Sequence, residues 1–137
     1  MITNRFARIF LGLMALAFCK VGLEAMVDPQ AVVAQVGITL DNPSALSSIR
    51  AVYGGMHFVF GLLCFWSLLK KPEPALWLTV LYTSGFLAGR TVSMFVDGAP
   101  NAFVVTWFGT EAFSLVASAV LLVSLRQARR PATVVTA

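Results

Sequence analysis

Charged residues are scarce in this chain: they make up 12% of its 137 residues, whereas 58% are hydrophobic. A soluble domain of this length carries about 25% charged residues, because polar groups must cover its surface. The deficit therefore excludes an ordinary soluble domain and indicates an integral membrane protein. The net charge of +4 is not gathered into a basic face, so we expect no nucleic-acid partner.

Residues that carry catalytic or metal chemistry are also few. His57 is the single histidine, which excludes a bis-histidine haem and a multi-histidine metal site. The two cysteines are predicted to lie at different membrane depths, too far apart for a disulfide. No Ser/His/Asp order, phosphate-binding loop or paired-cysteine motif is present. We therefore expect no cofactor, no metal and no enzymatic activity.

Four apolar segments are each long enough to cross a hydrocarbon layer of about 30 Å as a helix: 6–27, 45–69, 75–96 and 102–125. After the first of them, Asp28-Pro29 is typical of a helix start and predicts a short helix at 29–36 on the outer surface. The expected fold is all-α: a single domain over 1–137, a four-helix bundle in a lipid bilayer, with a loose tail at 131–137.

The positions of Lys and Arg at the ends of the apolar segments and in the connections predict the orientation of the chain. Seven of these residues lie at the two termini and in one turn: Arg5, Arg8, Lys70, Lys71, Arg126, Arg129 and Arg130. The other two connections, 28–44 and 97–101, contain no Lys or Arg. Because cytoplasmic loops are enriched in these residues, both termini are expected to be cytoplasmic.

Polar and ionisable side chains nevertheless occur within the outer halves of all four segments. Lipid satisfies none of these groups, so their helical stripes are expected to face one another inside the bundle. The candidate site residues are Lys20, Glu24, Arg50, Tyr53, His57, Arg90, Ser93, Asp97 and Glu111.

Three cations and three anions in this set balance, which leaves two interpretations open. One is a closed ion-pair network that fixes the register of the helices; the other is a functional pocket. Arg90 is expected to pair with Glu111 or Asp97, and Lys20 with Glu24 at a spacing of four residues. His57 is expected to be hydrogen-bonded beside Glu111, with a role in proton relay as the alternative.

Glycines within the segments predict where helices approach one another closely. Gly54-Gly55 and Gly61 lie on the second segment, and Gly85 and Gly89 form a GxxxG pattern on the third. The sequence leaves open whether the GxxxG pattern contacts another helix of this chain or a second copy.

Two stretches, IRAVYGGMHFVFGL and GRTVSMFVDGAP, resemble, together with Glu111, the bacterial domain-of-unknown-function 4345 family of small four-helix membrane proteins. A looser likeness is to DoxX-like proteins. His57 and the Lys20/Glu24 pair are not part of the pattern. The resemblance implies a four-helix fold in a bacterial inner membrane and implies no activity. The matching positions are Arg50, Tyr53, Gly54, Gly55, Gly61, Gly89, Arg90, Ser93, Asp97, Gly98, Pro100 and Glu111.

The leading functional hypothesis is a non-enzymatic one: an accessory subunit, or a protein that binds a lipid or small anion. Arg50, Arg90 and Glu111 would shape a pocket that opens outward under the 29–36 helix. A partner membrane subunit or a second copy is the expected protein partner. One alternative is a small-solute or proton-linked transporter, which would need a polar path through the apolar inner half. The other is a membrane enzyme with Glu111 and His57 as acid–base groups.

Overall fold

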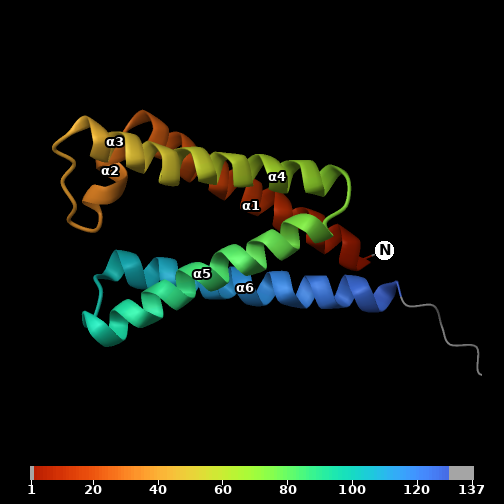
Figure 1. The fold of residues 1–137 in the computed structure, drawn as a ribbon. Helices are drawn as coiled ribbons and strands as arrows, with labels where there is room; N and C mark the ends of the chain where they lie inside the picture. The colour runs from red at the N-terminus through yellow and green to blue at the C-terminus, as the bar shows by residue number, and fades with distance from the viewer. Residues whose placement is uncertain (1, 130–137) are drawn as a thin grey trace, which may run out of the picture.

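The computed structural model describes residues 2–129, and every regular element in this range is helical. The predicted tail at 131–137 lies outside the described residues. Figure 1 shows the order of the elements along the chain. They are α1 (Ile2–Val27), α2 (Pro29–Ala34), α3 (Pro43–Ile49), the π-helix η1 (Arg50–Met56), α4 (His57–Leu69), α5 (Glu73–Val96) and α6 (Ala102–Ala128).

Three helical segments are long and apolar enough to cross a membrane: Ile2–Val27, Pro43–Leu69 and Ala102–Ala128. The second of them joins α3, η1 and α4 without a break. α5 has a comparable length of 24 residues, but Glu73 and Arg90 lower its hydropathy. The long helices reach beyond the predicted ranges by a few residues at some ends, and the short helix predicted at 29–36 ends at Ala34.

Side-chain caps explain where three of the helices begin. Asp28, Asn42 and Asn101 each accept a hydrogen bond of 2.9–3.0 Å from the backbone N–H three residues further along the chain. Proline follows Asp28 and Asn42, where its fixed φ suits the first helical position and its missing N–H costs nothing. The N-terminal ends of α2, α3 and α6 are therefore set by local sequence.

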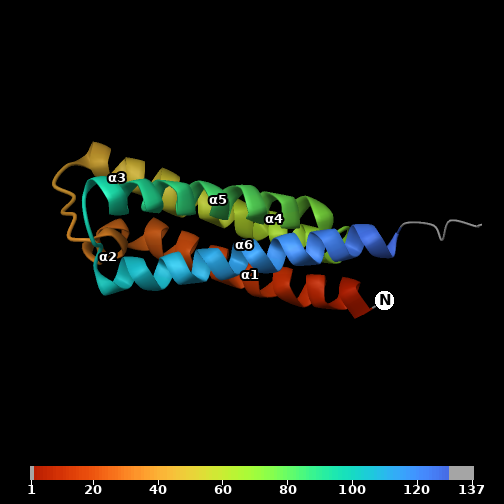
Figure 2. The ribbon, with the colours of Figure 1, turned by 90° about the horizontal axis from the view of Figure 1, so that it is seen from below.

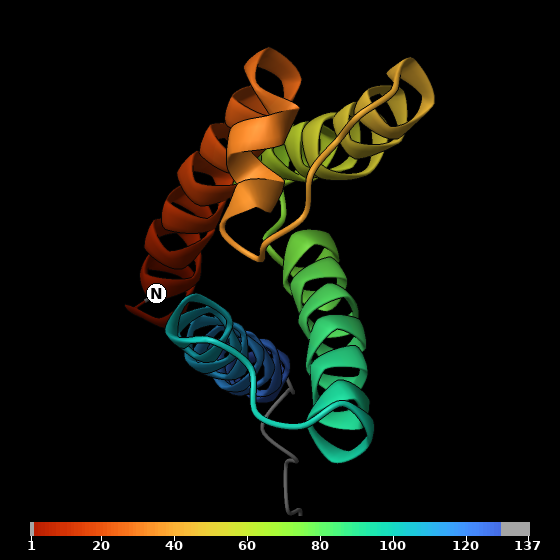
Figure 3. The same cartoon turned by 90° about the vertical axis from the view of Figure 1, so that its left-hand side faces the viewer.

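The long helices form two pairs. α1 packs mainly against α4 and η1, and α5 packs mainly against α6. Figures 1 and 2 show the start of α1, the α4–α5 turn and the end of α6 at one end of the molecule. α2, α3 and the α5–α6 turn lie at the other end, where the two pairs diverge (Figures 1 and 3).

Polar contacts join neighbouring elements at both ends. At the end with the termini, Arg8 donates to backbone carbonyls at the C-terminus of α4, including that of Leu68, and Arg129 forms an ion pair with Glu73. At the other end, Asn101 Nδ2 donates to the Gln35 carbonyl at 3.0 Å and links the two helix pairs. The C-terminal carbonyls of α4 thus gain partners that the helix itself cannot provide.

The apolar core fills the half of the bundle that contains the start of α1 and the end of α6, and it reaches the other half at Phe18. Its buried members come from all four long segments: Ala7, Leu11, Ala15, Phe18, Cys64, Ala75, Leu76, Leu122 and Leu125. The cavity described below lies in the half where the pairs diverge.

Only some of the predicted packing glycines lie between helices. Gly54 and Gly61 face α1, where an added Cβ would contact the backbone or side chains of that helix. Gly22 does the same from the α1 side. In contrast, a Cβ on Gly85 or Gly89 would meet no atom within 4 Å. The close approach is therefore between α1 and the continuous helical segment formed by η1 and α4. The GxxxG pattern does not contribute to it.

This difference predicts opposite effects for two Gly→Ala variants. A methyl group on Gly22 would lie 2.7 Å from the Phe58 backbone nitrogen, so Gly22→Ala forces the helices apart. We expect it to lower the free energy of unfolding by about 1–3 kcal/mol, as overpacking does, in thermal unfolding in detergent.

Gly85→Ala is the matched control, because the methyl group enters open space. It should leave the unfolding free energy unchanged or raise it by about 0.5–1 kcal/mol, since alanine stiffens a helix. Equal destabilisation by the two variants would contradict the assigned packing.

Candidate functional site

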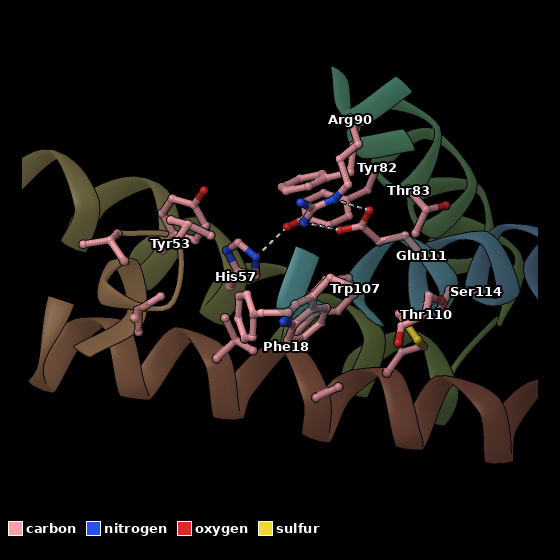
Figure 4. Close-up of a pocket in the computed structure, with 18 of the residues that line it drawn as sticks. Phe18, Tyr53, His57, Tyr82, Thr83, Arg90, Trp107, Thr110, Glu111 and Ser114 are labelled. Atoms are coloured by element: carbon pink, nitrogen blue, oxygen red, sulfur yellow. Dashed lines mark hydrogen bonds and ion pairs between the residues drawn. The ribbon is translucent and has the colours of Figure 1, made fainter. Parts of the chain in front are cut away.

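A cavity of about 250 Å³ lies between the two helix pairs, at the end where they diverge. Side chains from α1, α2, α3, η1, α4, α5 and α6 line it, and most of them are aromatic or aliphatic. α2 contributes Val32 and Val33 to the lining, which places this short helix at the wall of the cavity. Figure 4 shows the polar residues of the wall.

Aromatic rings surround the histidine in this wall. The rings of Tyr53 and His57 are stacked, with centroids 5.7 Å apart and planes 11° from parallel. Phe18 and Phe86 meet His57 edge to face at 6.0 and 6.4 Å. Such aromatic pairs add about 0.5–1.5 kcal/mol each beyond the area they bury. The position of the imidazole is thereby fixed by α1, η1 and α5 together.

His57 is also held by hydrogen bonds on both ring nitrogens. Its Nδ1 lies 3.3 Å from the Val52 carbonyl, and its Nε2 lies 2.6 Å from the Tyr82 hydroxyl (Figure 4). A carbonyl only accepts, so in the neutral ring Nδ1 carries the hydrogen and Nε2 accepts from Tyr82. The predicted hydrogen-bonded histidine is present, with Tyr82 as its partner instead of Glu111.

Arg90 and Glu111 form the charged part of the wall. Arg90 donates from Nε to Glu111 Oε2 at 2.7 Å and from Nη2 to Oε1 at 2.9 Å, a bidentate pair (Figure 4). The Glu111 side chain is 10% exposed and that of Arg90 is 23% exposed. The guanidinium also lies 5.9 Å from the centre of the Phe86 ring. Glu111, and not Asp97, is therefore the partner of Arg90.

This pairing makes the cavity electrically neutral among the described residues. Arg90 and Glu111 are the charged residues of its lining, and they are bound to each other. Two of the five N–H donors of a guanidinium are used by Glu111, which leaves donors for an oxygen of a bound molecule. Within residues 2–129, no group of three or more His, Cys, Asp or Glu side chains is placed to hold a metal ion.

Lys20 and Glu24 lie outside the cavity, contrary to the expectation that they face the bundle interior. Lys20 Nζ and Glu24 Oε1 are 2.6 Å apart, with the side chains 70% and 53% exposed. The reason is their helical phase: Phe18 and Gly22 are buried, and Lys20 is about 200° round the helix from each of them. The pair neutralises itself on the outer face of α1.

Arg50, Ser93 and Asp97 are also outside the cavity. Arg50 is exposed and donates from Nε to the Met26 carbonyl at 3.1 Å, near the C-terminus of α1. The Ser93 hydroxyl donates to Asp97 Oδ2 at 2.7 Å on the exposed face of α5. Each of these groups finds a local partner, so none needs the bundle interior. Of the predicted site residues, the structure brings together Tyr53, His57, Arg90 and Glu111.

Several lining residues were absent from the predicted set, above all Phe18, Phe103 and Trp107. A signal for two of them was available, since Phe103, Trp107 and Glu111 are spaced by four residues and share one face of α6. Phe18 offers no such signal, because an aromatic residue in an apolar segment is ordinary. Its role depends on the ring of Tyr82, 5.1 Å away on α5.

One family model, described as a domain of unknown function (DUF4345), matches residues 6–126 and thus nearly the whole chain. The chain belongs to the DUF4345 family. The match confirms the predicted family resemblance and includes every residue of the cavity wall. Comparison with curated proteins and with solved structures gives no match. Membership of DUF4345 brings no known activity, so function must be inferred from the site.

A double-mutant cycle tests whether Arg90 and Glu111 compensate each other. Arg90→Gln leaves the Glu111 carboxylate without its partner, and breaking a buried pair in this way costs about 3–5 kcal/mol. Because Arg90 is partly exposed, we expect a loss near the lower end of that range, measured as the decrease in the free energy of unfolding in detergent. The double variant with Glu111→Gln should recover most of the loss. Additive losses would show that the two side chains act independently.

Proposed function

We propose that the chain crosses the membrane four times, with both termini in the cytoplasm of a bacterial cell. Three segments are apolar and long enough to do so, and α5 has a sufficient length. Of the two charged residues that lower the hydropathy of α5, Arg90 is neutralised by Glu111, and Glu73 at the start of the helix forms an ion pair with Arg129. The start of α1 and the end of α6 lie at one end of the molecule with the α4–α5 turn, which contains Lys70 and Lys71, and this supports a cytoplasmic location for that end (Figure 1).

Cysteine labelling tests this topology. Lys71→Cys and Ala99→Cys, each in a Cys19→Ala/Cys64→Ala background, place a single thiol in the α4–α5 or the α5–α6 turn. In spheroplasts, a membrane-impermeant maleimide should label the cysteine at 99 directly and the one at 71 only after lysis. The reverse pattern, or direct labelling of both, would overturn the proposed orientation.

Within this topology, the cavity lies in the outer half of the bilayer and binds an amphipathic, lipid-like molecule with an uncharged polar group. The observation that carries this proposal is the composition of the wall: an apolar, aromatic enclosure with one closed ion pair. Small-molecule sites typically combine such apolar linings with a few polar groups that orient the ligand. The protein acts by binding and does no chemistry on the molecule.

The neutrality of the cavity favours an uncharged ligand over the small anion considered from the sequence. An anion would have to displace the Glu111 carboxylate from a bidentate pair, or share Arg90 with it at the cost of repulsion. Arg50, the second cation expected in the pocket, lies outside it. A hydroxyl or carbonyl group can accept from the remaining Arg90 donors without disturbing the pair.

The closed end of the bundle supports binding over transport. A transporter needs access from both sides, but the half that contains the termini is filled by the apolar core around Leu11, Leu76 and Leu122. In this half, the buried hydroxyls of Thr79 and Ser118 donate to carbonyls of their own helices. The core thus separates the cavity from the end of the bundle that we assign to the cytoplasm.

Native mass spectrometry tests the binding proposal. Wild type, transferred from membranes directly into lipid nanodiscs, should carry a reproducible non-covalent adduct. The mass of this adduct, together with analysis of the molecules extracted from the purified protein, identifies the ligand class. In the Arg90→Gln/Glu111→Gln variant, which keeps the cavity neutral, we expect at least about tenfold weaker retention, equivalent to about 1.4 kcal/mol.

The matched control is Lys20→Gln/Glu24→Gln, which removes an ion pair of the same kind from the outer face of α1. It should retain the adduct. A folded wild type without any adduct, or equal retention by both double variants, would contradict a binding site at Arg90 and Glu111.

A further inference from the structure

A second hollow lies next to the cavity, on the face of α5 that points away from the bundle. Leu81, Gly85 and Gly89 line this hollow and do not line the cavity. We call it the α5 groove. Tyr53, Tyr82, Phe86 and Arg90 line both the groove and the cavity, so the wall between the two spaces is a single layer of side chains.

The two glycines keep this groove open. Both are exposed, and a Cβ on either would meet nothing within 4 Å. Leu81, one turn away, is 67% exposed, so this face of α5 is turned outward to the surroundings of the bundle. At the depth of Arg90 those surroundings are hydrocarbon, and an apolar hollow there must be filled by a lipid chain or by another protein.

The seam between η1 and α5 is bridged by side chains and has almost no backbone contact. η1 packs against α1, α2, α3 and α4, whereas α5 is not among its packing partners. The bridge is His57, the first residue of α4: it accepts a hydrogen bond from Tyr82 of α5, and its ring contacts the rings of Tyr53 of η1 and Phe86 of α5. Opening the seam therefore takes rotation of the Tyr82 and Phe86 side chains away from His57 and does not require η1 and α5 to separate as packed helices.

The size of the cavity indicates why a bound molecule would use this seam. Ligand sites usually measure about 300–1,000 Å³, and this cavity, at about 250 Å³, lies below that range. It can enclose the polar end of a lipid-like molecule but leaves no room for a long hydrocarbon chain. The α5 groove offers apolar space directly beyond the wall.

We infer that the α5 groove holds a hydrocarbon chain of the bound lipid, and that the η1–α5 seam is where this lipid enters from the bilayer. The inference rests on the proposed binding function and adds the ligand class: a membrane lipid whose polar end lies beside Arg90 and Glu111 while its chain extends past Gly85 and Gly89. The GxxxG pattern thereby serves as a lipid contact, and no second copy of the chain covers it.

Fluorescence quenching tests this placement of the chain. Trp107 lines the cavity, and Trp66→Phe with Trp77→Phe removes the other two tryptophans. The full chain is reconstituted in phosphatidylcholine vesicles that contain a diacylglycerol, a lipid with an uncharged polar end, brominated on one acyl chain. We expect strong quenching of Trp107 and loss of most of it in Gly85→Leu and Gly89→Leu, whose side chains fill the groove.

Gly109→Leu is the matched control, because a Cβ at this position also meets open space and Gly109 lines neither hollow. It should leave the quenching unchanged. Equal quenching in wild type and both groove variants would overturn the inference. So would a wild-type dimer that Gly85→Leu converts to a monomer, seen by analytical ultracentrifugation.

The binding function can fail separately from the groove. If the native adduct persists in Gly85→Leu and the quenching does not change, the cavity binds its ligand without the groove. If wild type carries no adduct at all, the binding function itself is contradicted, whatever the quenching shows.

Discussion

The bidentate pair of Arg90 and Glu111 is the interaction on which the cavity half of the bundle depends. A lone arginine at membrane depth costs about 2.5–3.5 kcal/mol on insertion scales, so α5 can be stable there only with a partner. Glu111 supplies it from α6 through two short hydrogen bonds. The pair holds α5 and α6 in register and leaves the space between the helix pairs without net charge.

The two halves of the molecule are packed in different ways. Near the termini, small residues such as Ala7, Ala15 and Ala75 allow the helices to approach, and leucines fill the remaining volume. At the other end, rings replace the small residues: Phe18, Tyr53, Tyr82 and Phe86 contact one another or His57 without closing the space between the pairs. The close packing of one half makes it possible for the other half to stay open.

Much of this could be predicted from the sequence, because helical periodicity and membrane energetics are local or additive. The positions of the helices and the need of Arg90 for a carboxylate partner follow from them, whereas the family was predicted from the resemblance of motifs. The position of Arg50 outside the cavity does not follow from them. Its predicted position assumed 3.6 residues per turn throughout the segment. Because η1 is a π-helix, with one additional residue in its hydrogen-bonded turn, the side chains before it are rotated by about 100° about the helix axis. Gly54 and Gly55 lie within η1, but two adjacent glycines do not by themselves predict a π-helix. A pocket under the 29–36 helix was predicted, but its mostly apolar lining was not, since the cavity arises from the divergence of two helix pairs.

The closed pair in the cavity also has an electrical consequence. The charges of Arg90 and Glu111 cancel, so an uncharged molecule that enters or leaves does no work against the transmembrane voltage, which acts on each unit charge with about 2.3 kcal/mol per 100 mV. Ions in the surrounding solution have no unpaired charge in the cavity to screen. For the uncharged lipid that we propose as the ligand, occupancy follows the amount of ligand in the bilayer and is the same in an energised and a de-energised cell.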